Sequence, residues 1–278
     1  MDLQGGRRSS NVEDQRGRRG PVAIGLGTVL VVTLVGAYFG VDPRTLLQAL
    51  DQGSAEQSAP APTTPAEDQQ ADFVSAVLAS TEDAWHQVFQ ELGAEYREPK
   101  LVLFRDQVAS ACGGASAAVG PFYCPSDHKL YLDLSFFEDL RRRFGAPGDF
   151  AQAYVIAHEV GHHVQSLLGT EGKMRAAQRG APASERNALS VRLELQADCY
   201  AGLWAKVGQK QRKFLQPGDI EEAVQAANAI GDDRLQKQSQ GTVVPESFTH
   251  GSSAQRIHWF KVGFDRGTLE ACDTFTSQ

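Results

Sequence analysis

The residues most able to do chemistry lie in one string near the middle of the chain, AHEVGHH at 157–163. The string contains HExxH, and apolar residues around it predict a helix. On a helix His158 and His162 are one turn apart on the same face, so both imidazoles can bind one metal ion. Glu159 then lies beside the metal, where it can take a proton from a zinc-activated water. The string therefore predicts a zinc-dependent hydrolase with Glu159 as general base.

A catalytic zinc ion needs a third protein ligand, which the sequence places on a different helix. A longer motif would supply Gly and His three and six residues after His162, but the chain has Gln165 and Leu168 there. The string ELQAD puts Glu194 and Asp198 one turn apart on another predicted helix. Glu194 is therefore the expected ligand, and Asp198 is expected to accept the free ring N–H of a ligating histidine.

Glu185 is a rival for the third ligand because it lies on the same predicted helix. The residue one turn after Glu185 is Leu189, which cannot hold a ligating histidine in place, so Glu194 is preferred. A solvated acidic helix face is the other interpretation of ELQAD, but its neighbours are unusually apolar for that role. We expect one zinc ion per chain, bound by His158, His162 and Glu194.

The elements that must position these residues are mostly predicted helices. Apolar residues recur at helical spacing in several segments, and two short segments have the composition of strands. The predicted helices cover 71–92, 135–144, 149–168, 184–207, 220–230 and 252–264, and the predicted strands cover 100–104 and 129–134. This order predicts an α+β fold in which helices dominate and the sheet is small.

An apolar segment, Pro21 to Val41, predicts a transmembrane helix ahead of this domain. At about 1.5 Å per residue, the segment can cross a hydrocarbon core of roughly 30 Å. A cleaved signal peptide is the alternative, but its apolar region is usually shorter and ends at a small-residue cleavage site. Arginines cluster before the segment and only Arg44 follows closely, which favours a cytoplasmic N-terminus and an exported C-terminal part.

The chain is therefore predicted to have four parts. They are a cytoplasmic tail at 1–20, an anchor at 21–41, a linker rich in Ala, Pro, Ser, Thr and Gln at 42–70, and a catalytic domain at 71–278. The chain has 27 basic and 34 acidic residues, which leaves no basic face of the kind that binds nucleic acid. The oligomeric state is not indicated by any pattern in the sequence.

Four cysteines are predicted to form two disulfides, because an exported domain meets an oxidising compartment. Three pairings are possible from the sequence. The Gly- and Pro-containing segment between Cys112 and Cys124 closes easily, which favours that pair and leaves Cys199 with Cys272. A cysteine zinc site is the alternative, but the chain has no CxxC spacing.

Four strings of the sequence resemble the YpfJ family of predicted neutral zinc metallopeptidases. They are AHEVGHHVQ, LELQADCYAGLWA, GPFYCPSDHKLYLDLSFF and NVEDQRG, and the likeness runs through most of the chain. The resemblance implies a bacterial protein with a single span in the cell (inner) membrane and a zincin-like catalytic core. The Glu-x-x-Ala-Asp arrangement is also similar to that of the gluzincin group, which includes HtpX-type peptidases. This likeness supports Glu194 as ligand and Asp198 as its supporting neighbour.

The resemblance also implies roles for one histidine and one arginine further along the chain. Relatives carry a histidine followed by an arginine, and Thr249 to Arg256 resembles that segment. His250 precedes a predicted helix N-terminus, where its imidazole can hold the oxyanion of a tetrahedral intermediate. Arg256 is expected to orient a carboxylate near the metal, or the substrate backbone. A histidine near a helix cap with a surface arginine is the other interpretation.

Together these features predict a membrane-anchored zinc metallopeptidase that acts on a peptide or protein substrate. An extended substrate is expected to pair with an edge strand, either Lys129 to Leu134 or the segment Gly120 to Cys124. The alternatives are a non-catalytic, zinc-containing binding module tethered to the membrane and a dormant regulated protease. A structural zinc site would keep its function when Glu159 becomes Gln, whereas an enzyme would lose it.

Overall fold

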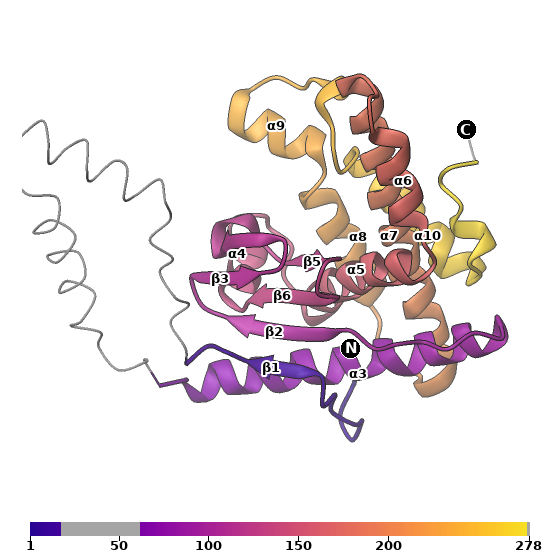
Figure 1. Ribbon diagram of the computed structural model, residues 1–278. Helices are drawn as coiled ribbons and strands as arrows, with labels where there is room; N and C mark the ends of the chain where they lie inside the picture. Colours follow the sequence, from indigo (N-terminus) through magenta and orange to yellow (C-terminus); the bar gives the residue numbers. More distant parts are fainter. Residues whose placement is uncertain (18–61, 277–278) are drawn as a thin grey trace, which may run out of the picture.

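The computed structural model of the chain describes residues 1–17 and 62–276 (Figure 1). Within these residues the fold is α+β and mostly helical, as the sequence predicts. The helices are α3 (Pro65–Glu91), α4 (Ser135–Arg142), α5 (Asp149–Leu167), α6 (Thr170–Gln178), α7 (Ala183–Arg212), α8 (Asp219–Ala229), α9 (Asp232–Gln240) and α10 (Ser253–Arg266). The strands are β1 (Val12–Asp14), β2 (Lys100–Phe104), β3 (Gln107–Ser110), β4 (Gly113–Ser116), β5 (Phe122–Cys124) and β6 (Lys129–Asp133).

The strands form a four-stranded sheet in the order β1-β2-β6-β5 and a separate hairpin of β3 and β4. Strands β1, β2 and β6 run parallel, and β5 is antiparallel to β6. Leu101 and Leu103 of β2 belong to the main core with Leu130 and Leu132 of β6, because alternate residues of a strand share one face. Strand β6 has a partner on each side, whereas β5 lies at the edge of the sheet.

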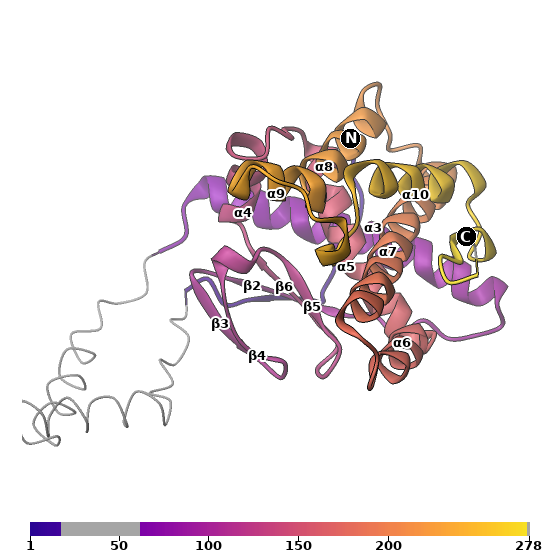
Figure 2. The ribbon, with the colours of Figure 1, turned by 90° about the horizontal axis from the view of Figure 1, so that it is seen from above.

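Helix α5 packs against β5 and β6 on one side and against α7 on another (Figure 2). Most of its side chains are buried, because neighbouring elements cover nearly all of its surface. Gly161 allows a close approach to α7, since a Cβ at this position would lie 3.0 Å from the carbonyl oxygen of Ala197. Helices α7 and α10 approach each other more closely still, because a Cβ on Gly263 would lie 1.9 Å from the carbonyl oxygen of Cys199. These glycines let polar side chains of three helices meet.

Both disulfides are the pairs that the sequence favours. Cys112 and Cys124 join the turn of the β3–β4 hairpin to the end of β5. Cys199 and Cys272 join α7 to the short 3-10 turn Glu270–Cys272 that follows α10, and both of these cysteines are fully buried. The second disulfide therefore fixes the chain beyond α10 to the helix that carries Glu194.

Residues 1–17 form an N-terminal arm that packs along the sheet and α3 (Figure 1). Strand β1 of the arm pairs with β2, and Arg8 forms an ion pair with Asp72 of α3 at 2.7 Å. The side chain of Glu82 on α3 is fully buried and takes its partners from the arm. Arg7 Nη1 lies 2.7 Å from Glu82 Oε2, and Ser9 Oγ donates to Glu82 Oε1 at 2.5 Å. The N-terminal arm is therefore part of the folded domain.

The predicted boundaries before this domain need correction. Helix α3 begins at Pro65, within the predicted linker 42–70, because Thr64 caps it: the Thr64 side chain accepts from the backbone of Glu67, whose side chain accepts from the backbone of Thr64. The predicted tail 1–20 also does not stand apart. Its described part, residues 1–17, packs against the catalytic domain. The placement of the tail in the cytoplasm and of the catalytic domain outside it stays a prediction from the sequence.

The predicted anchor, Pro21 to Val41, lies outside the described residues. Within 1–17 and 62–276, no helix combines the length and the apolar composition that crossing a bilayer requires. Attachment to a membrane therefore stays a prediction from the sequence.

The other differences concern short elements. The strand predictions at 100–104 and 129–134 are confirmed, the second to within one residue, and the predicted helices all appear with shifted ends. The short strands β1, β3, β4 and β5 and the helices α6 and α9 were not predicted. Each is too short or too polar to show a periodic apolar pattern.

Candidate metal centre

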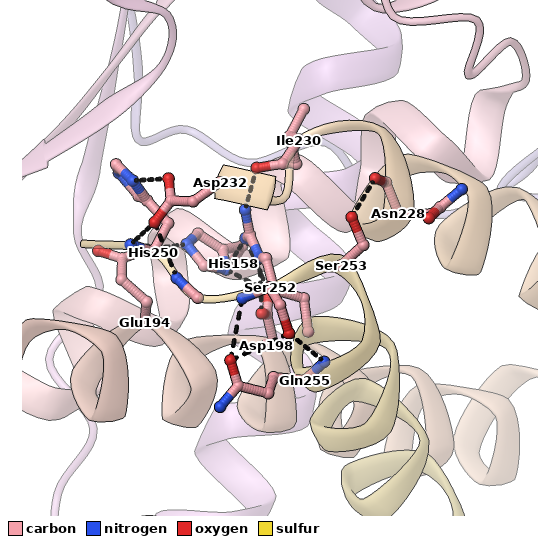
Figure 3. A network of polar contacts seen from close by, with 12 residues as sticks. His158, Glu194, Asp198, Asn228, Ile230, Asp232, His250, Ser252, Ser253 and Gln255 are labelled. Atoms are coloured by element: carbon pink, nitrogen blue, oxygen red, sulfur yellow. Dashed lines mark hydrogen bonds and ion pairs between the residues drawn. The ribbon is translucent and has the colours of Figure 1, made fainter. Parts of the chain in front are cut away.

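The three predicted ligands meet between α5 and α7, where Figure 3 shows His158 close to Glu194. Nε2 of His158 lies 3.1 Å from Glu194 Oε2, and Nε2 of His162 lies 3.5 Å from Glu194 Oε1. Zinc bonds of about 2.1 Å arranged as a tetrahedron would place neighbouring ligand atoms about 3.4 Å apart. Two imidazole nitrogens and one carboxylate also form a donor set that zinc accepts. The three side chains therefore fit a zinc ion in both spacing and chemistry.

The far nitrogen of each histidine is held by a hydrogen bond that turns Nε2 toward Glu194. Nδ1 of His158 lies 2.8 Å from Asp198 Oδ1, and since a carboxylate only accepts, Nδ1 carries the hydrogen. Nδ1 of His162 lies 2.9 Å from Gln165 Oε1. The Gln165 amide is fixed in turn, because its Nε2 donates to the carbonyl of Leu193 at 2.7 Å. With Nδ1 engaged in this way, each ring directs its Nε2 toward Glu194, where a metal would replace the hydrogen on that nitrogen.

Asp198 is the centre of a buried polar network behind His158. Arg256 donates to both of its carboxylate oxygens, from Nε at 2.9 Å and from Nη2 at 2.9 Å, in a bidentate pair. The hydroxyl of Tyr154 donates to Asp198 Oδ1 at 2.5 Å. Burial by itself raises the pKa of Asp198, but the charges of Arg256 and His158 outweigh burial and lower it to about 2. The carboxylate thus stays ionised and holds His158 in place.

Glu159 follows the first ligand and turns its side chain into the same cleft as the two histidines. Within the described part of the chain, its carboxylate has no hydrogen-bond partner. Burial raises the pKa of Glu159, and the neighbouring histidines oppose this rise. A carboxylate that is close to the ligands, unpaired and of raised pKa has the properties of a general base.

His250 lines the cleft from the loop before α10, and the side chain of Asp232 holds that loop by hydrogen bonds (Figure 3). The backbone N–H groups of Thr249, His250 and Gly251 all donate to Asp232 Oδ2, at 2.7, 2.7 and 3.1 Å. Nδ1 of His250 lies 3.3 Å from Asp232 Oδ1. This hydrogen bond raises the pKa of His250, and the charge of Glu194 adds to the rise. The loop therefore presents a histidine that can donate a hydrogen bond into the cleft.

The cleft that contains these residues has a volume of about 580 Å³ and is also lined by Tyr154 and Arg256. Of the predicted site residues, the structure brings His158, His162 and Glu194 together as a possible ligand group. The rival Glu185 is exposed near the start of α7 and does not line the cleft. Arg256 contacts the carboxylate of Asp198, and its predicted role in orienting a carboxylate stays a prediction.

Three further residues line or support the site but are not assigned to it from the sequence; Tyr154 is one of several tyrosines that the sequence leaves open as a hydroxyl donor. Tyr154 lies one turn before His158, and Gln165 lies three residues after His162, so helical spacing could have suggested both. Asp232 precedes His250 by 18 positions and lies on a different element. Because that contact depends on how the loop folds, no local spacing could have indicated it.

Comparison with known proteins agrees with this geometry. Residues 1–275 match the protein family described as "Putative neutral zinc metallopeptidase". The chain belongs to this family. It is 50% identical over 286 aligned positions to "Uncharacterized protein YpfJ" of Escherichia coli K12, and the alignment covers 99% of each chain. It is 45% identical to "Uncharacterized protein Rv2575" of Mycobacterium tuberculosis H37Rv over 215 positions, which cover 74% of this chain and 72% of the relative. No solved structure is significantly similar.

The family assignment bears out the resemblance that the four sequence strings carry. It also supports zinc as the metal and a peptide or protein as the substrate.

Proposed function

We propose that this protein is a zinc metallopeptidase that hydrolyses peptide bonds in the cleft between α5, α7 and α10, with one zinc ion per chain. One observation carries the proposal: the Nε2 atoms of His158 and His162 converge on Glu194 at 3.1 and 3.5 Å. The unpaired carboxylate of Glu159 lies in the same cleft. Spacing, donor chemistry and a free base thus occur together, as metal-assisted hydrolysis requires.

Each side chain of the site has a separate role in the proposed reaction. Zinc, when bound by the three ligands, supplies a Lewis acid that polarises the scissile carbonyl and makes water a better nucleophile. Glu159 takes a proton from the attacking water and delivers it to the leaving amine. His250 donates a hydrogen bond to the oxygen on which negative charge develops. Asp198, held by Arg256 and Tyr154, keeps the ring of His158 fixed during these steps.

The substrate is expected to lie along β5. Strand β6 is paired on both sides, whereas β5 is at the edge of the sheet and packs against α5 beside the ligands. The outer backbone groups of an edge strand can pair with an extended peptide. The sequence offers two candidate segments for pairing with the substrate, Gly120 to Cys124 and Lys129 to Leu134. The first contains β5 and is therefore the better candidate.

The proposal is tested with the full chain, because the N-terminal arm belongs to the fold. Zinc content and hydrolysis of a mixture of unstructured peptides are measured for the wild type, Glu159→Gln and Glu185→Gln. Glu185 is a matched control because it is an exposed glutamate on α7. We expect about one zinc ion per chain in all three proteins, and a 10²- to 10⁴-fold loss of hydrolysis in Glu159→Gln alone.

Two results would overturn the proposal. Wild-type protein that binds zinc but hydrolyses no peptide would favour a zinc-containing binding module. Hydrolysis that survives in Glu159→Gln would remove the proposed base.

A further inference from the structure

One end of the cleft, next to α4, has an apolar wall. Val119 is 67% exposed, more than the other large exposed hydrophobic residues of the described chain, yet it lines the cleft. Pro121 and Phe122 follow it, and Phe136 and Phe144 of the α4 region line the same cleft. Exposed apolar side chains gathered in a concave site are typical of a ligand-binding surface. These five residues are called the α4 wall below.

The α4 wall is held in place by close packing. Gly120 adopts a φ of +82°, which a residue with a side chain rarely does, and a Cβ there would lie 3.4 Å from Phe136. The ring of Phe136 packs on Phe144 with a centroid distance of 6.3 Å. The loop before β5 therefore rests on Phe136, and Val119 stays on the surface of the cleft instead of entering the core.

The charges near the α4 wall are already paired. Arg143 donates to Asp139 at 2.9 Å on α4 and also lies over the ring of Phe144 at 5.7 Å. The opposite end of the cleft is more polar, with Glu171 of α6 paired to Arg175 and accepting from the hydroxyl of Ser166. A charged substrate side chain at the α4 wall would lose water without gaining a free opposite charge. An apolar side chain would instead bury both its own surface and that of the wall.

We infer that the α4 wall is a specificity subsite that receives one bulky apolar side chain, such as Leu, Ile, Met or Phe, of an extended peptide substrate. The inference rests on the proposed peptidase function. The wall begins at the residues that lead into β5 and continues into the cleft that holds His158 and Glu159. A peptide paired with β5 would therefore place one of its side chains against the wall at a fixed number of residues from the cleaved bond.

The test is the cleavage-site profile of the full-length protein on a mixture of unstructured peptides, read by mass spectrometry. Wild type, Val119→Glu, Val119→Lys and Val243→Glu are compared at equal zinc content. Val243 is a matched control because it is 41% exposed and does not line the cleft. Val119 is more exposed still, so substitutions there should leave the fold intact.

The wild type is expected to prefer a bulky apolar residue at one position by at least about tenfold over a charged residue. Val119→Glu should shift that position toward Lys and Arg, and Val119→Lys toward Asp and Glu, each by on the order of tenfold, while other positions stay unchanged. Val243→Glu should match the wild type.

Two results would overturn the subsite while leaving the peptidase proposal intact. One is wild-type cleavage without an apolar preference at any position. The other is a preference that both Val119 variants retain. Absence of wild-type cleavage would instead overturn the proposed function, and the subsite with it.

Discussion

The metal centre and the N-terminal arm use the same physical device, a buried carboxylate that pairs with an arginine from a distant part of the chain. At the metal centre, Asp198 accepts from Arg256, which lies 58 positions later. In the N-terminal arm, Arg7 pairs with the buried Glu82 of α3. The surroundings differ, because Arg256 is buried with its partner whereas the side chain of Arg7 is 40% exposed.

The two regions also differ in how their residues are arranged along the sequence. The residues of the candidate metal centre lie on two helices, with His158 and His162 one turn apart on one and Glu194 and Asp198 one turn apart on the other, which a sequence pattern can express. The contacts of the N-terminal arm join single residues across large separations, such as the 73 positions between Ser9 and Glu82. A functional site whose residues are spaced by one helical turn can therefore be found in a sequence. A short polar segment that supports the fold through single distant contacts cannot.

The largest expected effect concerns the compartment of the N-terminal arm: if the arm packs on the domain, the arm and the candidate metal centre must lie on the same side of any membrane. Ser10→Cys in the arm and Ser239→Cys on α9 place single thiols at two exposed serines. Each is labelled in intact and in permeabilised cells with a maleimide that does not cross membranes. Because the arm packs on the domain, we expect the same labelling pattern for both thiols. Opposite patterns would show that the arm does not pack as described.

Within the metal centre, Asp198→Ala is expected to have the largest effect on stability. It leaves Arg256 buried without its partner, so the free energy of unfolding should fall by about 3–5 kcal/mol. Urea denaturation of the full chain measures the change. Asp265→Ala, at an exposed position of α10, is the control and should change stability by less than about 0.5 kcal/mol. A similar small change in Asp198→Ala would contradict the network described here.

In the N-terminal arm, Arg7→Ala should have a smaller effect of about 1–2 kcal/mol: it leaves the buried carboxylate of Glu82 without its arginine, but Arg7 itself is partly exposed, so solvent already screens the ion pair. Part of this loss should disappear in a Glu82→Gln background, where no buried charge remains to be neutralised. Zinc content should be unchanged in all three variants. A double-mutant cycle with no coupling between Arg7 and Glu82 would show that this ion pair does not stabilise the fold, unlike the pair of Arg256 and Asp198.

The smallest predicted effect concerns Asp232→Asn and the pH dependence of hydrolysis. Asp232 raises the pKa of His250, so the protonated imidazole is present below that pKa and is lost as the pH rises through it. Asp232→Asn should move the alkaline fall of activity to lower pH and reduce turnover about tenfold, with zinc content and KM little changed. His250→Ala should remove the alkaline fall that His250 causes. An unshifted profile in Asp232→Asn would remove the positioning role of Asp232.

The sequence predicted which side chains lie together at the candidate metal centre, for a physical reason. His158, His162, Glu194 and Asp198 are spaced by one helical turn within two helices, and helices with strong apolar patterns are predictable. Gly161 then lets α5 and α7 approach closely enough for the two pairs to lie together. The two disulfides were also predictable, because loop closure favours one pairing of the four cysteines.

The remaining features depend on contacts that no local pattern encodes. Asp232 reaches His250 only because the loop before α10 folds back on the start of α9. Strand β1 is three residues long and is defined by its pairing with β2, so its own composition carries little signal. The packing of residues 1–17 on the domain depends on single polar contacts such as Ser9 with Glu82, which leave no apolar pattern in the sequence of the tail.

The measurement that tests the central claim most directly is the zinc content of the purified full chain after dialysis against a weak chelator. Wild type, Glu194→Ala and Glu185→Ala are compared by elemental analysis. The two glutamates share α7, but only Glu194 lies within 3.5 Å of both ligating histidines. We expect about one zinc ion per chain in the wild type and in Glu185→Ala, and loss of zinc in Glu194→Ala. Zinc retained in Glu194→Ala, or absent from the wild type, would contradict the metal centre proposed here.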